Sequence, residues 1–492
     1  MIFSSIPYIF LFLPICFLIY FLLNKLHFTG ASKLWLCIAS LFFYGYWEVK
    51  YLPLLLFSII LNFSFGNLVY PDKYKINVHN RKLLLTFGVF INILILAYYK
   101  YSNFFIDNIN LLFHIEKSIN TILLPLGVSF FTFTQIAFLI DSFKGKVKEF
   151  NFINYSLFVT FFPHLIAGPI LHHAEMMPQF SNSNNKKINY SNILSGIIIF
   201  SIGLIKKIII ADGFAVFANE GFSNAFIHDF YSAWTTSISY TFQIYFDFSG
   251  YCDMAVGSAL LFNIKLPINF NSPYKATDIQ DFWRRWHITL GRYLRDYIYI
   301  PLGGNRVSNF RNYLNLFITF AIAGLWHGAS WLFILWGALH GAALIIHRIW
   351  SKSGIKLFKP LSWFITFMFI NSSWVFFRSE NINQALEILS KMLSFSEAKK
   401  IPLEGLPLVD LIRYGNLAGL VAEKISFGIA AHLTFLIMSS ISFYICTRKN
   451  SQEIAINTEI GYSKITRYAI FSSIATYLSL HSESAVFLYF NF

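Results

Sequence analysis

The residue with the clearest chemical signal is His327, which lies deep inside a long apolar run at residues 313–347. An ionisable side chain is costly to place within a membrane, so the default interpretation of such a residue is a functional site. Trp326 precedes it and Gly328 follows it, so that another group could approach the imidazole closely. The alternative is a neutral histidine that hydrogen-bonds a neighbouring helix. That alternative is favoured for His340, which has a similar frame of tryptophan and glycine.

A buried histidine in such a pocket could act as a general base. The ordinary pKa of histidine is near 6.5, and burial disfavours the charged form of an imidazole. A neutral imidazole can accept a proton from a hydroxyl group. This chemistry suits acyl transfer from a thioester, in which the base activates an alcohol and hydrogen-bond donors stabilise the oxyanion. A pocket that excludes water would suppress hydrolysis of the donor.

A basic segment at residues 263–311 interrupts the apolar pattern. Thr277 with Gln280 matches a capping box, so we expect one amphipathic helix that begins there and ends near Pro301. One face of this helix would be apolar: Ile279, Phe282, Trp283, Trp286, Leu290, Tyr293, Leu294 and Tyr297. The opposite face would carry Arg284, Arg285, Arg292 and Arg295, with His287 at the border between the two faces.

Two interpretations of this basic helix stay open from its composition. It could lie in the plane of the membrane, with its aromatic residues inward and its arginines on anionic lipid headgroups. The same arginines could instead bind a phosphorylated ligand.

The elements around these residues indicate an all-helical, polytopic integral membrane protein. Of the 492 residues, 56% are hydrophobic and only 13% are charged, about half the charged share of an ordinary soluble domain. About eleven or twelve crossings are predicted, together with in-plane or re-entrant helices. The apolar segments lie at residues 6–23, 34–46, 52–69, 83–99, 122–140, 156–171, 193–210, 234–262, 313–346, 361–377, 427–446 and 468–480.

For two of these segments the sequence makes a more specific prediction. The segment at 313–346 is too long for one span and short for two complete ones, so it should break near Gly324, Gly328 and Ser330. The segment at 6–23 has no basic region before it and no cleavage site after it, so it is expected to be a retained span. Without repeats or low-complexity linkers, the chain is expected to form a single domain over residues 1–492, with its signature core at about 122–350.

Composition and spacing also argue against several other functions. The net charge of +14 fits basic cytoplasmic loops and anionic headgroups better than nucleic acid, since no basic tail or stacking module is present. The four cysteines are scattered through apolar segments without the spacing of a zinc site. His164, His172 and His173 lie around a break at Gly168-Pro169, with only Glu175 at ligand spacing, so no metal site is expected.

Three sequence blocks together resemble the membrane-bound O-acyltransferase (MBOAT) family. They are FPHLIAGPI at 162–170, DFWRRWHITLGRYLRDYIYIPLGGNR at 281–306 and AGLWHG at 323–328. The resemblance covers nearly the whole chain and is strongest to the bacterial branch, which includes the alginate O-acetyltransferase membrane subunit and the peptidoglycan O-acetyltransferase. One departure is Leu171-His172-His173, where relatives tend to carry a basic and an aromatic residue. Any role for that loop is therefore left open.

The resemblance implies a helical bundle that encloses a chamber in the bacterial inner membrane. His327 matches the family's catalytic histidine, and His287 matches its second signature position, which holds His or Asn. Acetyl-CoA would be the acyl donor from the cytoplasm, with no permanently bound cofactor. The acceptor would be a cell-envelope glycan, reached with an extracytoplasmic SGNH-hydrolase-like acetyltransferase as partner. From their charge, Arg284, Arg285, Arg292 and Arg295 are candidates for binding the cofactor phosphates.

Two other classes of function were weighed against acyl transfer. A transporter or flippase for a lipid-linked sugar tends to show paired, interrupted helices in corresponding halves of the chain. Here the broken helix near His327 has no matching partner in the first half of the sequence. A scaffold that only recruits a soluble enzyme would not need the intact histidine motifs. We therefore expect an O-acyltransferase that modifies an alginate-like polymer or peptidoglycan.

Overall fold

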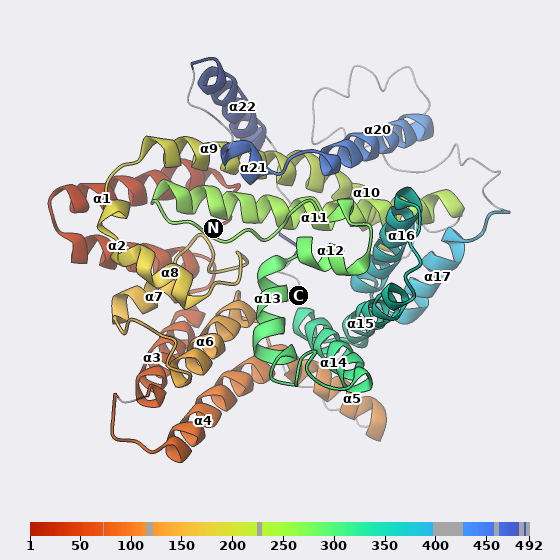
Figure 1. Ribbon diagram of the computed structural model, residues 1–492. Coiled ribbons are helices and arrows are strands. Elements are labelled where there is room, and N and C mark those ends of the chain that lie inside the picture. Colours follow the sequence, from red (N-terminus) through yellow and green to blue (C-terminus); the bar gives the residue numbers. More distant parts are fainter. Residues whose placement is uncertain are drawn as a thin grey trace. The chain divides into compact units, whose positions relative to one another are not determined.

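The computed structural model describes residues 1–71, 73–114, 122–223, 229–396, 427–456, 462–481 and 487–488. All regular secondary structure in these ranges is helical (Figure 1). This confirms the all-helical class, and it suits a lipid environment, where a helix satisfies its own backbone polar groups. The chain divides into two compact units, of which unit 1 is Met1–Phe200 with Met254–Ile268, and unit 2 is Ser201–Asp253 with Asn269–Phe492. The single domain at 1–492 stays a prediction.

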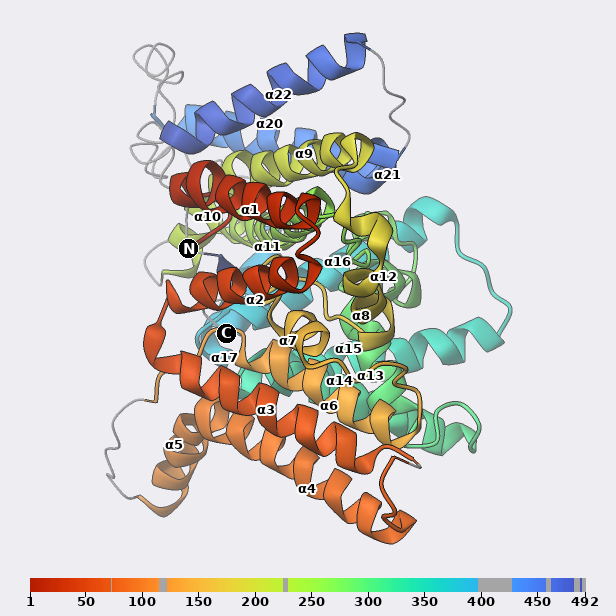
Figure 2. The same ribbon diagram turned by 90° about the vertical axis from the view of Figure 1, so that its left-hand side faces the viewer.

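Unit 1 contains the N-terminal helices and the first part of α9. Within it, α3, α4 and α6 pack against one another, and α7 packs on α2 and α8 (Figure 2). The helices are α1 (Leu13–Lys25), α2 (Thr29–Gly45), α3 (Leu52–Val69), α4 (Val78–Leu96), α5 (Ser102–Phe113), α6 (Val128–Phe143), α7 (Phe152–Thr160), α8 (His173–Ser181) and α9 (Tyr190–Ile205).

Unit 2 contains the rest of the helices and the residues with the strongest chemical signal. The long helix α11 passes from unit 2 into unit 1. The helices are α10 (Asp212–Phe222), α11 (Phe230–Leu261), α12 (Ile279–Arg285), α13 (Ile288–Leu294), α14 (Asn309–His327), α15 (Trp331–Lys352), α16 (Lys359–Arg378), α17 (Ile382–Met392), α20 (Phe427–Thr447), α21 (Ser451–Ile456) and α22 (Tyr462–His481).

Six helices among the described residues are long and apolar enough to cross a membrane. They span Pro7–Lys25, Val49–Val69, Val78–Phe113, Tyr190–Phe222, Trp331–Lys352 and Lys359–Arg378. Three shorter apolar helices are found at Val128–Phe143, His432–Thr447 and Tyr468–Leu480. Large apolar side chains such as Leu18, Phe57 and Phe87 are exposed on the spans of unit 1, as contact with lipid requires. The chain is thus a multi-pass integral membrane protein.

The predicted count of eleven or twelve crossings stays a prediction, because the six helices above are those that meet the length and hydropathy of a full crossing among the described residues. Helix α2 has 17 residues, the lower end of the length that a crossing takes. Helix α11 is long enough, but it carries a buried polar series that includes Thr236, Ser239 and Asp247. Apolar content in a sequence window does not distinguish a lipid-facing span from a helix buried among other helices.

The predicted span at 156–171 was wrong. Helix α7 ends at Thr160, and α8 begins only at His173, so the residues between them form turns. Pro163 and Pro169 cause this break, because a proline lacks the helical N–H donor and disfavours helical geometry in the preceding residue. Most residues of this connection are buried, including Phe161 and His164.

Candidate active site

The basic segment forms two short helices instead of the single amphipathic helix expected from the sequence. Helix α12 begins after Asp278, whose side chain accepts a hydrogen bond from the backbone N–H of Asp281 at 2.7 Å. Helix α13 starts at Ile288, after a break at Trp286 and His287. The capping box at Thr277 and the continuous helix were therefore wrong. The apolar face was identified correctly, since six of its eight residues are buried.

Hydrogen bonds to a neighbouring loop stabilise this break between α12 and α13. The backbone N–H of Ile288 donates to the carbonyl oxygen of Asn269 at 3.0 Å, and the N–H of Asn271 donates to the carbonyl oxygen of Arg285 at 2.9 Å. The N–H of Thr289 donates to Oδ1 of Asn269 at 3.2 Å. These bonds use backbone groups that a continuous helix would pair within itself. The loop therefore satisfies the backbone at the point where the helix stops.

His287 lies at the break, fully buried and in a left-handed backbone conformation with φ of 44°. Histidine and asparagine adopt this conformation more readily than most other non-glycine residues, which accounts for the two residue types that the resemblance implies here. Its Nδ1 lies 3.1 Å from Oδ1 of Asn269. Since an amide oxygen only accepts, Nδ1 carries the proton and Nε2 keeps a lone pair. Burial lowers the pKa of His287 to about 3, so the ring is neutral near pH 7.

His327 is the last residue of α14, at the break predicted within the long apolar run. Gly328 caps α14, and α15 begins at Trp331, which confirms that prediction. The side chain of His327 is 2% exposed.

Aromatic rings surround the imidazole of His327. The ring centroids of Trp326, Trp336 and Phe377 lie 5.0, 5.2 and 5.3 Å from it. The His287 ring lies 6.4 Å from the His327 ring, centroid to centroid. The fold therefore brings together the two histidines that sequence reasoning selected, within one buried cluster of aromatic rings in unit 2.

His340 has a structural role, as the sequence favoured. Its Nδ1 accepts the indole N–H of Trp283 at 3.2 Å, so its Nε2 carries the proton and donates to Oγ of Ser373 at 3.1 Å. Both ring nitrogens are thus occupied in tying α12 and α16 to α15. The rings of His340 and Trp336 lie 4.6 Å apart, so His340 also fixes a wall of the His327 pocket.

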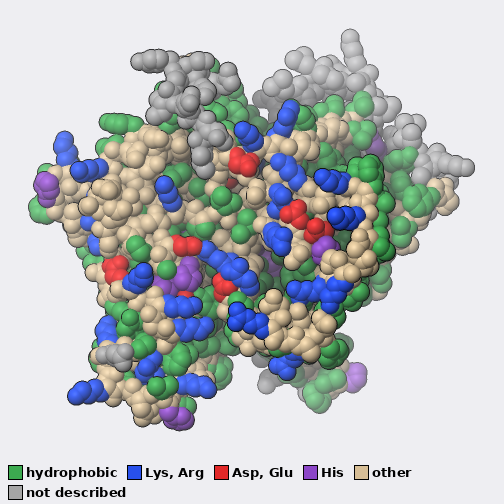
Figure 3. Space-filling model, in the orientation of Figure 1, with side chains coloured by type: hydrophobic (Ala, Val, Ile, Leu, Met, Phe, Trp, Pro, Cys, Tyr) green, Lys and Arg blue, Asp and Glu red, His purple; other side chains and the backbone are tan. Residues whose placement is uncertain are grey.

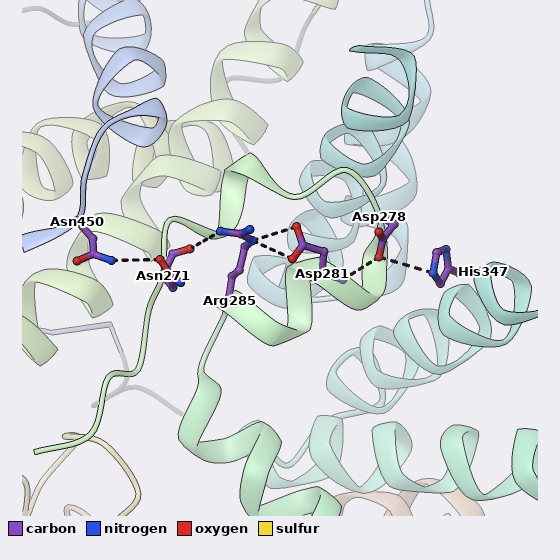
Figure 4. A network of polar contacts seen from close by, with 6 residues as sticks. All are labelled: Asn271, Asp278, Asp281, Arg285, His347 and Asn450. Atoms are coloured by element: carbon purple, nitrogen blue, oxygen red, sulfur yellow. Dashed lines mark hydrogen bonds and ion pairs between the residues drawn. The ribbon is translucent and has the colours of Figure 1, made fainter. Parts of the chain in front are cut away.

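The predicted phosphate-binding role of the four arginines stays a prediction, and the structure gives three of them different surroundings. Arg285 pairs with Asp281, both oxygens of which lie 2.9 Å from its Nε, and also reaches the carbonyl oxygen of Asn271 (Figure 4). Arg295 pairs with the neighbouring Asp296 at 2.7 Å. Arg284 is exposed and has no hydrogen bond or ion pair with the residues that the structure describes. Figure 3 shows Lys and Arg side chains interspersed with acidic ones near α12.

Two further polar contacts, one on each side of the Arg285–Asp281 pair, surround α12. Asp278 lies 3.6 Å from Nε2 of His347 on α15, and Asn450 donates to Oδ1 of Asn271 at 3.1 Å (Figure 4). Arg285 is therefore part of a network that holds α12, and Arg284 is the better candidate for an incoming anion.

Sequence reasoning missed three residues that complete the site. Asn269 fixes the tautomer of His287, Ser373 fixes that of His340, and Trp336 forms the wall next to His327. The indole Nε1 of Trp336 is buried and has no hydrogen-bond partner among the described residues. Asn269 and Ser373 are small polar residues far away in sequence, and no local pattern marks them. Trp336 could have been identified from the sequence, because tryptophan and glycine occur close to both His327 and His340.

Replacing His287 by asparagine is expected to flatten the pH dependence of stability. The pKa of His287 is about 3 in the folded protein, but near 6.5 in an unfolded chain. The unfolded state therefore binds the proton first, and wild-type stability falls as the pH drops below about 6.5, by up to about 1.4 kcal/mol per pH unit. Asparagine does not titrate. Thermal unfolding in detergent at two pH values, one on each side of this range, measures the difference, and equal losses in both proteins would contradict it.

The chain is similar to one protein family and to several known proteins. The model of the membrane-bound O-acyltransferase family matches residues 17–378. A peptidoglycan O-acetyltransferase of Helicobacter pylori is 45% identical, over 100% of this chain and 98% of its own length. The probable alginate O-acetylase AlgI of Pseudomonas aeruginosa is 39% identical over 84% of this chain and 79% of its own length. A teichoic acid D-alanyltransferase of Streptococcus thermophilus is 27% identical over 54% of this chain and 72% of its own length.

Proposed function

Because the chain belongs to the membrane-bound O-acyltransferase family, we propose that it moves acetyl groups from cytoplasmic acetyl-CoA across the inner membrane of a bacterium, for O-acetylation of a cell-envelope glycan. The observation that carries this proposal is the burial of His327 in an aromatic pocket, with a second neutral histidine 6.4 Å away. Such a pocket keeps a base neutral and keeps water from the thioester.

Peptidoglycan is the first acceptor to test. A relative named for that polymer matches this chain along its whole length, whereas the relatives named for alginate match 84 or 85% of it. An alginate-like polymer is the second candidate. An SGNH-hydrolase-like acetyltransferase outside the cytoplasm is the proposed partner that completes transfer to the polymer.

The proposed chemistry places His327 as the general base. Its imidazole takes the proton of the acceptor hydroxyl as the oxygen attacks the thioester carbonyl. The tetrahedral intermediate then collapses, the carbon–sulfur bond breaks, and the imidazolium returns its proton to the CoA sulfur. The indole N–H of Trp336 is a buried donor beside His327 that could stabilise the oxyanion. His287, with its lone pair on Nε2, would orient the donor or the acceptor.

Arg284→Gln is expected to raise the KM for acetyl-CoA about 1.4- to 5-fold while leaving kcat unchanged. An exposed charge pair contributes about 0.2–1 kcal/mol, which corresponds to this range. The measurement is the rate of CoA release against acetyl-CoA concentration in purified protein. Arg311→Gln removes another exposed arginine and serves as the control. An equal rise in KM in both variants would show a general charge effect and not a phosphate contact at Arg284.

The proposed function is tested in cells that lack the gene. Acetyl transfer predicts less ester-bound acetate per unit of glycan, with the amount of glycan unchanged, and recovery when the gene is restored. A transporter or flippase for a lipid-linked sugar predicts less glycan itself, with the same acetate per unit. Alkaline release of acetate, normalised to the sugar content of purified peptidoglycan, separates the two outcomes.

A further inference from the structure

Three side chains of unit 1 converge on one point, far from the histidines of unit 2 in sequence. Asp141 lies on α6, His172 is the N-cap of α8 and His173 is its first residue. Nε2 of His172 and Nε2 of His173 lie 2.7 and 3.2 Å from the same oxygen, Oδ2 of Asp141. Sequence reasoning considered both histidines as metal ligands and found only Glu175 nearby. It missed Asp141, which lies 32 residues before His173.

The size of this cluster fits a small divalent ion. The nitrogen and oxygen atoms that could act as ligands all lie within 4.8 Å of one another. Zinc binds histidine nitrogen and carboxylate oxygen at about 2.0–2.2 Å, so ligands of a tetrahedral ion are separated by about 3.3 Å. The two nitrogen–oxygen distances, 2.7 and 3.2 Å, lie within about an ångström of that separation, and no pair of donor atoms is more than about 1.5 Å wider than it.

Burial makes two of the three donors rigid. The side chains of Asp141 and His173 are 2% and 3% exposed, and the His173 ring packs edge-on against Phe138 and Phe158. The side chain of His172 is 29% exposed, so one side of the cluster is open to solvent. An ion bound there would keep room for water as a further ligand, an arrangement of three protein ligands and an open position.

Two interactions in the cluster compete with a bound ion and would have to break when it binds. Nζ of Lys146 lies 3.9 Å from Oδ1 of Asp141, but its side chain is 62% exposed and can turn into solvent. Nδ1 of His172 accepts the backbone N–H of Ala174 at 3.3 Å, so its proton is on Nε2. Metal binding at Nε2 would move that proton to Nδ1 and release this long capping bond.

We infer that Asp141, His172 and His173 form a site for a divalent transition-metal ion such as Zn²⁺. Two imidazoles and one carboxylate are a donor set that suits zinc and its neighbours in the first row, and not magnesium or calcium. The ion would join the C-terminal end of α6 to the start of α8, across the buried connection at residues 161–172. This role is independent of the proposed acetyl transfer in unit 2.

The test uses the full-length protein in detergent, stripped with EDTA and then supplied with ZnCl₂. Loose zinc is removed by gel filtration, and zinc per chain is measured by mass spectrometry. We expect about one Zn²⁺ per chain and a higher thermal unfolding midpoint, because an ion that binds only the folded state stabilises it. A wild-type protein that retains no zinc would overturn the inference.

His172→Arg is the sharpest variant, because arginine can still pair with the Asp141 carboxylate but cannot bind a cation. We expect it to fold and to lose both the retained zinc and the shift in midpoint. His173→Gln should lose them as well. His79→Gln removes an exposed histidine on α4 and should behave like the wild type. Equal zinc in the wild type and in His172→Arg would place the ion elsewhere and refute the site.

Discussion

The His327→Ala protein is expected to transfer acetyl groups about 100- to 10,000-fold more slowly than the wild type, the usual loss when a general base is removed. His327 is the ionisable group at the centre of the aromatic pocket, and the ring of His287 lies 6.4 Å away. Alanine at this position leaves the hydroxyl without a base. The measurement is ester-bound acetate in glycan from cells that carry either gene at equal membrane levels.

A control is needed because alanine also leaves a cavity among the rings of Trp326, Trp336 and Phe377. His347→Ala serves this purpose, since His347 lies on α15 with its side chain 27% exposed and outside the pocket. That variant should keep most of its activity. A folded His327→Ala protein with the acetylation level of the wild type would remove His327 from the mechanism.

Gly337→Val is expected to destabilise unit 2 by about 3 kcal/mol or more and to abolish acetyl transfer. Helices α14 and α15 cross with their backbones in contact at Gly324 and Gly337. A Cβ atom on Gly337 would fall on the carbonyl oxygen of Phe320, and one on Gly324 would fall on that of Phe333. Backbone atoms cannot turn aside as a side chain can, so the helices must separate. His327, at the end of α14, would move with them.

The matched control is Gly30→Val, which makes the same substitution in α2. A Cβ atom on Gly30 meets nothing within 4 Å. That variant should change the stability only slightly, because valine has a somewhat higher helix propensity than glycine and the added side chain meets nothing. Thermal unfolding in detergent and acetate content of the glycan measure both effects. A Gly337→Val protein as stable and active as Gly30→Val would contradict the close crossing of α14 and α15.

The sequence predicted well those features that depend on local composition. The apolar helix at Pro7–Lys25, the break between α14 and α15 and the burial of His327 all follow from apolar content, length and the position of glycines. That the first span is retained stays a prediction. These signals lie within a few residues of the feature itself. The roles of His327 and His287 in catalysis stay predictions, although the fold places them in one pocket.

Features that depend on distant residues were missed. The helix break at His287 depends on a hydrogen bond to the carbonyl oxygen of Asn269 and one from the backbone N–H of Asn271, and helical periodicity does not predict them. The convergence of Asp141 on His172 depends on the packing of α6 near α8. Each of these requires the tertiary fold.

The central claim is that this chain uses acetyl-CoA as its donor, with His327 as the base. The most direct test follows release of free CoA from acetyl-CoA by the purified wild-type and His327→Ala proteins, with peptidoglycan fragments or an alginate-like polymer as acceptor. The account predicts CoA release by the wild type that depends on the acceptor and is lost in the variant. Equal release by both folded proteins would contradict it.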